Sequence, residues 1–243
     1  MKALFFDCDG VLVDTERDGH RVAFNRAFQK AGIDAEWSFE RYGELLKVAG
    51  GKERMRVFFD QTGWPVTETE KDELIVRLHA SKTEIFLDII ESGSLPVRPG
   101  IERIVDEAHA AGLTLAVCST SNEKSVTAVV NRLLGPARAP HFAGIFAGDI
   151  VPRKKPDPAV YLLASERLGI APADCLVVED SRNGLLAAVA AGMKCVVTKS
   201  AYTGGEGFSE ACAIYDEFGD PPEMYVSLEE VLARASAARS IDP

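Results

Sequence analysis

Two aspartates separated by one residue follow a short apolar run near the start of the chain. Leu4 to Phe6 read as a buried strand, and Asp7 and Asp9 come directly after it. Side chains alternate along an extended chain with a period of two, so both carboxylates can point the same way. Two like charges this close raise each other's pKa unless a cation neutralises them. The pair therefore fits either a site for Mg²⁺, a hard cation that takes oxygen ligands, or a solvated Asp-x-Asp-Gly turn.

Three further segments favour the metal site over the turn. Ser119 follows a second apolar strand, Glu179 and Asp180 end a third, and Lys155 lies just before the start of a helix. With the first pair, the chain thus offers a nucleophile pair, a hydroxyl, a cation and an acidic pair, three of them at the carboxyl end of a strand. Ligands bind at that edge of open parallel sheets, which predicts one shared site.

These four motifs, in this order, resemble those of the haloacid dehalogenase (HAD) superfamily of phosphatases. Further segments look like the CbbY subgroup, which is similar to β-phosphoglucomutase in fold and whose known enzymes hydrolyse xylulose-1,5-bisphosphate. These segments are residues 42–46, 50–54, 82–84, 147–149 and 219–222. The resemblance implies a Mg²⁺-dependent phosphatase for a small sugar bisphosphate, namely xylulose-1,5-bisphosphate, that acts through an aspartyl-phosphate.

The resemblance leaves other functions open. A sugar phosphomutase of the β-phosphoglucomutase type would use the same aspartyl-phosphate but return the phosphoryl group to a sugar. A dehalogenase would need neither an acid two residues after the nucleophile nor Mg²⁺, so Asp9 and Asp180 argue against it. The complete set of motifs likewise argues against a sugar-phosphate binding module without catalysis.

The resemblance also implies roles for the core residues. Asp7 would be the nucleophile, and Asp9 would protonate the leaving oxygen and then activate water. Ser119 and Lys155 would hold the transferring phosphoryl group, whose charge is spread over its equatorial oxygens. Thr120 and the adjacent Ser121 would add donors to the same cradle. The implied Mg²⁺ ligands are Asp7, Asp9 through its backbone carbonyl, Glu179 and Asp180.

A second group of residues is expected to contact the rest of the substrate. Glu16, His20 and Tyr42 match positions that touch the sugar-like part in CbbY-like chains. Lys52 and Lys82 match positions that supply cations for a distal phosphate, and two glycines before Lys52 allow close backbone approach.

One position departs from the pattern of β-phosphoglucomutase-like chains. Those chains place a proton-relaying histidine four residues after the motif threonine, but here Gly19 holds that position and His20 comes one later. A one-residue shift turns a helical side chain by about 100°, unless a bulge restores the register. The departure weakens a mutase assignment and leaves His20 open between a packed and a functional histidine.

The elements that must position these groups fall into two patterns. From residue 99 onward, helices and strands alternate, with strands expected at 113–118, 142–147, 175–178 and 194–198. Such alternation predicts an α/β fold with a doubly wound, Rossmann-like parallel sheet. Residues 17 to about 93 instead look all-helical. We therefore expect a HAD core domain of residues 1–15 and 94–243, with a helical cap domain of residues 16–93 inserted after the first strand.

The composition limits the remaining possibilities. The chain has 243 residues, a hydrophobic content of 47% and a net charge of −10. This excess of acid disfavours nucleic acids and anionic membranes as partners, and no apolar run reaches the length of a membrane span. We expect a monomer that binds a small sugar phosphate and keeps its five cysteines reduced. A bacterial cytoplasmic protein and a plastid stromal protein without its transit peptide would look alike.

Overall fold

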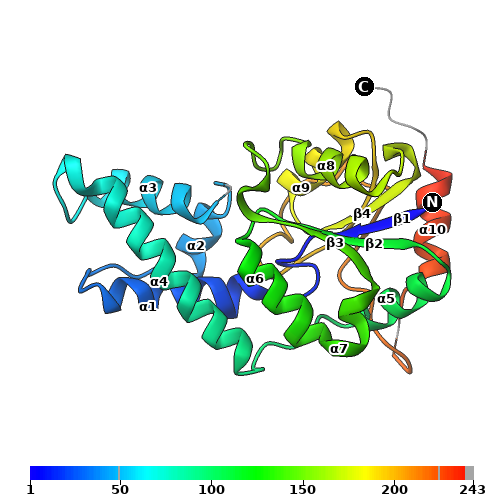
Figure 1. Cartoon of the computed structure of the whole chain (residues 1–243), viewed down its shortest axis with the longest axis horizontal. Coiled ribbons are helices and arrows are strands. Elements are labelled where there is room, and N and C mark those ends of the chain that lie inside the picture. Colours follow the sequence, from blue (N-terminus) through cyan, green and yellow to red (C-terminus); the bar gives the residue numbers. More distant parts are fainter. Residues whose placement is uncertain (49, 224, 239–243) are drawn as a thin grey trace.

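The computed structural model describes residues 1–48, 50–223 and 225–238, which form two lobes (Figure 1). In these residues, one lobe contains a six-stranded sheet in which every pairing is parallel, with the order β3-β2-β1-β4-β5-β6. This order confirms the doubly wound α/β fold. The strands are β1 (Ala3–Phe6), β2 (Thr114–Cys118), β3 (Phe142–Phe146), β4 (Cys175–Glu179), β5 (Lys194–Thr198) and β6 (Ala213–Tyr215).

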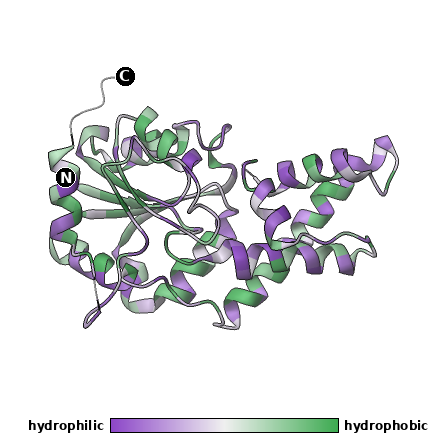
Figure 2. Ribbon diagram, turned by 180° about the vertical axis from the view of Figure 1, so that it is seen from behind, coloured by the Kyte–Doolittle hydropathy of each residue, from purple (hydrophilic) through white to green (hydrophobic). Residues whose placement is uncertain are grey.

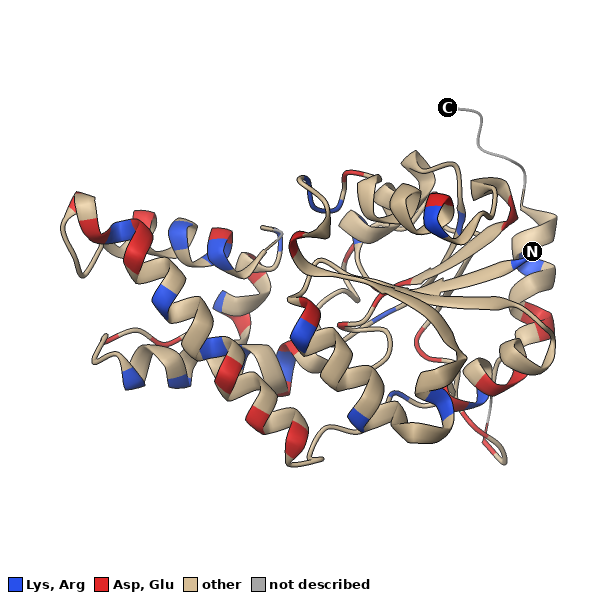
Figure 3. Ribbon diagram, in the orientation of Figure 1, with Lys and Arg blue, Asp and Glu red and all other residues tan. Residues whose placement is uncertain are grey.

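Helices cover both faces of this sheet, and the strands between them are apolar and almost free of charged residues (Figures 2 and 3). One face packs against α5 (Ile101–Ala110), α6 (Glu123–Ala128) with its extension η3 (Val129–Leu134), and α10 (Leu228–Ala237). The other packs against α8 (Ala159–Leu168) and α9 (Arg182–Ala190). Short elements complete this lobe: α7 (Gly135–Arg138), η4 (Ala139–His141), η5 (Gly148–Ile150) and η6 (Pro172–Asp174).

The second lobe, which we call the cap, is helical. It has its own aromatic core, in which Phe24, Phe28, Trp37 and Phe59 are almost fully buried. The base of its longest helix packs instead against the sheet lobe, through Phe86 and its neighbours. The elements are η1 (Glu16–His20), α1 (Arg21–Lys30), α2 (Phe39–Leu45), α3 (Gly51–Thr62), η2 (Glu68–Glu70) and α4 (Lys71–Glu91). All lie within the expected insertion, whose boundaries at residues 15/16 and 93/94 stay a prediction.

Two helices contain π-helical turns. The first cap helix opens with a π-helical turn, η1, before α-helical geometry begins at Arg21. The helix after Asn122 is α-helical only to Ala128 and continues as the π-helix η3. Side chains cap two of the helices: the Asn122 side chain accepts from Lys124 N, and Thr67 forms a capping box with the residue three later.

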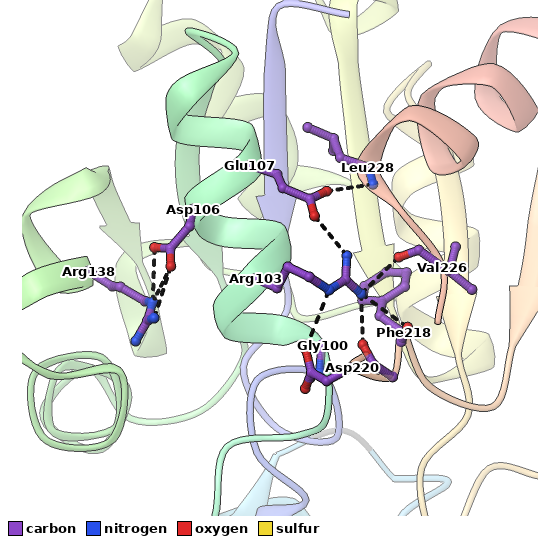
Figure 4. Close-up of polar contacts among 10 residues, drawn as sticks. Gly100, Arg103, Asp106, Glu107, Arg138, Phe218, Asp220, Val226 and Leu228 are labelled. Atoms are coloured by element: carbon purple, nitrogen blue, oxygen red, sulfur yellow. Dashed lines mark hydrogen bonds and ion pairs between the residues drawn. The ribbon is translucent and has the colours of Figure 1, made fainter. Parts of the chain in front are cut away.

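The C-terminal part of the chain is fastened to α5 by an arginine (Figure 4). The Arg103 guanidinium donates to the carbonyls of Gly219 and Val226, at 2.7 and 3.0 Å, and to Glu107 at 2.9 Å. The Asp220 carboxylate accepts from the backbone N–H of Gly100 at 2.8 Å. The segment 219–222, which the sequence singled out, therefore braces the chain where it returns from the cap to the sheet lobe.

None of the helices in the described part of the chain combines the length and the apolar character needed to cross a membrane. The five cysteines are free thiols, and Cys212 is the one among them that is partly exposed.

Candidate active site

The ends of three neighbouring strands bring the core residues together. Asp7 follows β1 and continues its ladder, because its N–H donates to the Val178 carbonyl at 3.0 Å. Ser119 follows β2 in the same way and donates to the Phe146 carbonyl at 2.9 Å. Glu179 is the last residue of β4. These ends open into a cleft of about 470 Å³ between the sheet lobe and the cap, which Thr120, Ser121 and Asp180 also line.

Three buried carboxylates at this point need a cation. Oxygen atoms of Asp7, Glu179 and Asp180 lie within 4.8 Å of one another. Burial raises the pKa of Asp7 to about 8 despite the opposing charge of Lys155, and burial also raises the pKa of Asp180 well above its usual value, with Glu179 and Asp7 adding to it. An all-oxygen donor set whose own charges repel fits a hard divalent cation. The geometry agrees with three of the four ligands implied by sequence.

A glycine allows the closest approach in this group. Gly10 has a φ of +83°, and a Cβ atom there would lie 2.1 Å from the Asp180 carboxylate. Its carbonyl accepts a hydrogen bond from Arg98, whose guanidinium also donates to the Lys199 carbonyl at 2.6 Å. The first loop of the site is thus held by the segment through which the chain returns from the cap to the sheet lobe.

Lys155 lies in the middle of the acidic residues. Its Nζ donates to Asp7 at 2.7 Å, to Glu179 at 2.6 Å and to the Cys118 carbonyl at 2.8 Å. Burial alone would lower its pKa, but the two carboxylates outweigh burial and raise it. Lys155 is therefore a fixed cation beside the candidate nucleophile. The neighbouring Lys154 instead pairs with Asp149 at 2.8 Å, away from this site.

Asp9 has a different environment from Asp7. Its carboxylate accepts hydrogen bonds from the hydroxyls of Thr15 and Ser121 and contacts His20 Nε2 at 2.9 Å. Burial alone would raise its pKa, but His20 and the two hydroxyls hold the pKa well below its usual value. The pKa values of the two aspartates are thus driven apart, but without metal and substrate the directions are opposite to the assigned roles, because Asp7 tends to keep its proton and Asp9 to lose it. The side chain of Asp9 is thus engaged by protein groups, and its backbone carbonyl as a metal ligand stays a prediction.

The π-helical turn explains the apparent one-residue shift of His20. Arg21 N donates to Glu16 O, an i→i+5 bond that inserts one extra residue into the turn. The bulge carries the imidazole back to Asp9, so His20 is not merely packed. Its ring stacks on Phe86 at 4.0 Å, and Lys82 Nζ lies 2.7 Å from Nδ1. With the lysine donating to Nδ1, the Nε2–H group of His20 donates to Asp9.

Glu16 and Tyr42 form a second polar group. Glu16 lines the cleft, and its carboxylate accepts from the Tyr42 hydroxyl and lies 3.6 Å from Arg54 NH1. Arg54 also donates to the Tyr42 hydroxyl at 3.1 Å. Tyr42 is fully buried and does not line the cleft, so its position favours support of Glu16 over direct contact with a substrate.

Of the two lysines expected to hold a distal phosphate, Lys82 lines the cleft and Lys52 does not. Lys82 is buried against His20, between the rings of Phe24 and Phe86, with its Nζ 5.0 Å from each ring centre. Lys52 is partly exposed, does not line the cleft, and points to Asp149 of the sheet lobe at 3.9 Å. The position of Lys82 favours a role in orienting His20, and the position of Lys52 favours a contact between the cap and the sheet lobe. The expected clamp on a distal phosphate stays a prediction.

The cleft also contains residues that sequence reasoning did not assign. Lys47, Arg54 and His79 line it from the cap, and Tyr202 lines it from the loop after β5. Signals existed for two of them. Arg54 belongs to the segment 50–54, which the resemblance to CbbY singled out. His79 precedes Lys82 by three residues, so His79 and Lys82 face the same side of α4.

The raised pKa of Asp7 predicts how stability depends on pH without metal. The folded protein keeps a proton on Asp7 up to a pKa of about 8, whereas the unfolded chain releases it near pH 4. The free energy of unfolding should therefore fall as pH rises from about 6.5 to about 8, by up to about 1.4 kcal/mol per pH unit. Below this range, the pKa of His79, lowered to about 4 by burial, acts in the opposite direction.

Urea unfolding in the presence of a chelator tests this at pH 6.5, 7, 7.5 and 8. Added Mg²⁺ should stabilise the protein more at pH 8 than at pH 6.5, because a bound cation favours the ionised carboxylates. A free energy of unfolding that rises with pH over this range in the chelated protein would contradict the assignment.

Comparison with known proteins agrees with this geometry. The family model of haloacid dehalogenase-like hydrolases matches residues 1–192. The CBBY-like protein of Arabidopsis thaliana is 56% identical over 225 residues, 91% of this chain and 70% of that protein. Protein CbbY of Rhodobacter capsulatus is 44% identical over 211 residues, 87% of this chain and 91% of that protein.

A solved structure is similar as well. CbbY from Rhodobacter sphaeroides in complex with phosphate has a TM-score of 0.83 and 38% identity, and the match covers 90% of this chain and 96% of that one. A mutant of the same protein, in complex with xylulose-(1,5)bisphosphate, matches equally well.

Proposed function

This chain belongs to the haloacid dehalogenase-like hydrolases and is a phosphatase of their CbbY-like group, and from this premise we propose that it hydrolyses a small sugar bisphosphate. The proposed substrate is xylulose-1,5-bisphosphate, the proposed cofactor is Mg²⁺, and the proposed intermediate is an aspartyl-phosphate on Asp7. The complex of the Rhodobacter sphaeroides protein with this bisphosphate supports the choice of substrate.

One observation carries the proposal: Asp7 lies among groups that suit nucleophilic attack on phosphorus. Its carboxylate is within 4.8 Å of Glu179 and Asp180 and 2.7 Å from Lys155. A divalent cation bound by the acidic residues would neutralise charge between the carboxylates and the phosphate. Lys155 and Ser119 would hold the equatorial oxygens, and Asp7 would attack in line.

Asp9 completes the reaction through its proton. It would protonate the leaving sugar oxygen and then remove a proton from the water that attacks the aspartyl-phosphate. The hydrogen bonds from His20, Thr15 and Ser121 fix the direction of its carboxylate. The low pKa of Asp9 means that it must acquire its proton when the anionic substrate enters, which weakens the ionised form.

A second candidate function is a sugar phosphomutase of the β-phosphoglucomutase type. The observation that favours it is the bulge at η1, which returns His20 to hydrogen-bond distance of Asp9, where the relay histidine of that group is expected. The two functions differ in whether water or a second sugar hydroxyl accepts the phosphoryl group.

A panel of sugar mono- and bisphosphates, assayed for released phosphate with Mg²⁺ present, tests the proposal. We expect xylulose-1,5-bisphosphate to give the highest kcat/KM, at least tenfold above sugar monophosphates, because remote binding energy aligns the reacting group. Activity should disappear with a chelator. Sugar phosphate isomerisation without stoichiometric phosphate release would instead establish the mutase.

The plant and bacterial relatives fit either a plastid stromal or a bacterial cytoplasmic location, which we retain as a proposal. The monomeric state stays a prediction.

A further inference from the structure

A side chain of the sheet lobe packs into the cap directly after β5. Among the residues that the structure describes, the aromatic core of the cap is built from side chains between residues 24 and 78 and from one side chain outside this range, Tyr202. The ring of Tyr202 stacks on Phe39 of α2, with ring centres 4.3 Å apart, and packs edge-to-face on Tyr42 at 5.7 Å. It also lies close to Gly43, where a Cβ atom would be 3.1 Å from Tyr202 Cδ1. Tyr202 thus docks the sheet lobe on α2.

The turn that carries Tyr202 also contacts the candidate metal site. The Thr203 hydroxyl accepts from Ser200 N at 2.9 Å, and Thr203 N donates to the Ser200 carbonyl at 3.3 Å, so residues 200–203 form a closed turn. Burial raises the pKa of Asp180, and the Ser200 side chain opposes this rise through a hydrogen bond. Ser200, Tyr202 and Asp180 all line the cleft. One short turn therefore contacts both the cap and a candidate metal ligand.

Both chain connections between the lobes are tied to the same part of the sheet lobe. On the outgoing connection, the Asp14 carboxylate accepts from Ala201 N at 3.1 Å. On the returning connection, the Arg98 guanidinium donates to the Lys199 carbonyl at 2.6 Å. The segment 199–203 is thus in contact with α2 and with both connections, the parts of the chain that would move if the cap turned relative to the sheet lobe.

We propose that Tyr202 is a positioning residue for Asp180: its docking on α2 fixes the segment 199–203, and this segment holds the Asp180 carboxylate in place for a cation through Ser200. The inference rests on the proposed function in one respect, which is that Asp180 binds Mg²⁺. Coupling between two sites is reciprocal. A cation at Asp180 therefore strengthens the docking of Tyr202 by the same factor by which docking strengthens cation binding.

The first test follows amide hydrogen exchange of residues 39–45 at pH 7 by mass spectrometry, with and without Mg²⁺. These residues form α2, a helix too short to be stable alone, so its exchange reports the contacts that hold it. Mg²⁺ should slow this exchange about fivefold or more in wild type, the lower end of typical coupling free energies. Tyr202→Ala should exchange faster without metal and lose the response to Mg²⁺.

Two further variants separate this role from a general effect on the fold. Tyr202→Phe should behave like wild type, because the Tyr202 hydroxyl has no hydrogen-bond partner among the described residues and the ring contacts remain. Ser200→Ala should keep the wild-type exchange of α2 without metal but lose the response to Mg²⁺. This change removes the contact with Asp180 and leaves the backbone hydrogen bonds to Thr203 intact.

The second test is calorimetric titration of Mg²⁺ into the same proteins at pH 7. The Kd of Mg²⁺ should be about fivefold or more higher in Tyr202→Ala than in wild type, and unchanged in Tyr202→Phe. Tyr225→Ala is the matched control for loss of a tyrosine. Tyr225 is exposed, packs under Arg103 at 4.8 Å and lies outside the cleft, so its loss should change neither the Kd nor the exchange of α2.

The results distinguish this inference from the proposed function. If wild type binds Mg²⁺ but α2 does not respond, or if the response persists in both Tyr202→Ala and Ser200→Ala, the coupling through this segment is wrong and the proposed function stands. An unchanged Kd of Mg²⁺ in Tyr202→Ala would overturn the coupling in the same way. If wild type does not bind Mg²⁺, the proposed cofactor fails and the inference fails with it.

Discussion

Replacing Asp7 with asparagine is expected to abolish turnover while the protein still folds. The amide keeps the shape of the side chain but cannot attack phosphorus, so kcat should fall by about four orders of magnitude or more. Stability without metal should rise, because the change removes the buried carboxyl group of Asp7, whose pKa is raised by burial and by the neighbouring Glu179 and Asp9. Phosphate release at saturating Mg²⁺ and urea unfolding with a chelator are the two measurements.

Asp18→Asn is the matched control, since Asp18 is an exposed aspartate that pairs only with Arg17 in the described structure. It should keep the activity of wild type. Retention of more than about a hundredth of wild-type kcat by Asp7→Asn would contradict a covalent mechanism through this residue.

The positions of the core residues could be predicted from the sequence because each motif directly follows an apolar strand. Asp7, Ser119 and Glu179 follow or end β1, β2 and β4, and parallel strands carry their carboxyl ends to one edge of the sheet. For these three residues, the local sequence pattern and the general topology of parallel sheets were enough to predict that they lie together. In contrast, β6 was missed because its three residues, Ala213–Tyr215, form no recognisable apolar run and owe their conformation to pairing with β5.

The position of His20 could not be predicted, because its cause lies far away in the sequence. The π-helical turn places the ring between Phe86, 66 residues later, and Asp9, eleven residues earlier. A count of residues from the motif threonine assumes 3.6 residues per turn and so gives the wrong face of the helix. The contacts of the ring with Phe86 and Asp9 offset the free energy that the irregular helical turn costs.

The roles of the cap lysines depended on tertiary packing in the same way. Both Lys52 and Lys82 lie on helices whose direction relative to the sheet lobe is set by the aromatic core of the cap. A sequence motif marks these residues but does not tell which side of the helix meets the cleft. The same packing brings Lys47 and His79 to the cleft without any motif that names them.

The second large effect is expected from Lys155→Met, with the adjacent Lys154→Met as its control. Lys155 is 5% exposed and contacts Asp7 and Glu179, so its loss leaves these two buried acidic groups without a cation. Breaking a buried ion pair in this way typically costs about 3–5 kcal/mol. Lys154 contacts the exposed Asp149, and a surface pair contributes about 0–1 kcal/mol. Urea unfolding at pH 7.5 without metal should separate the two variants clearly.

The destabilisation by Lys155→Met should also depend on pH and on metal, which distinguishes a lost charge from lost packing. Without the lysine, the pKa of Asp7 rises further in the folded state, so lowering the pH to 6 favours its protonated form and reduces the deficit. Mg²⁺ should reduce it as well, because the cation restores positive charge among Asp7, Glu179 and Asp180. Turnover should nevertheless stay at least about 10²-fold below wild type, since a donor to the phosphoryl oxygens is gone. Equal effects of the two methionine variants would mean that the choice of Lys155 over Lys154 is wrong.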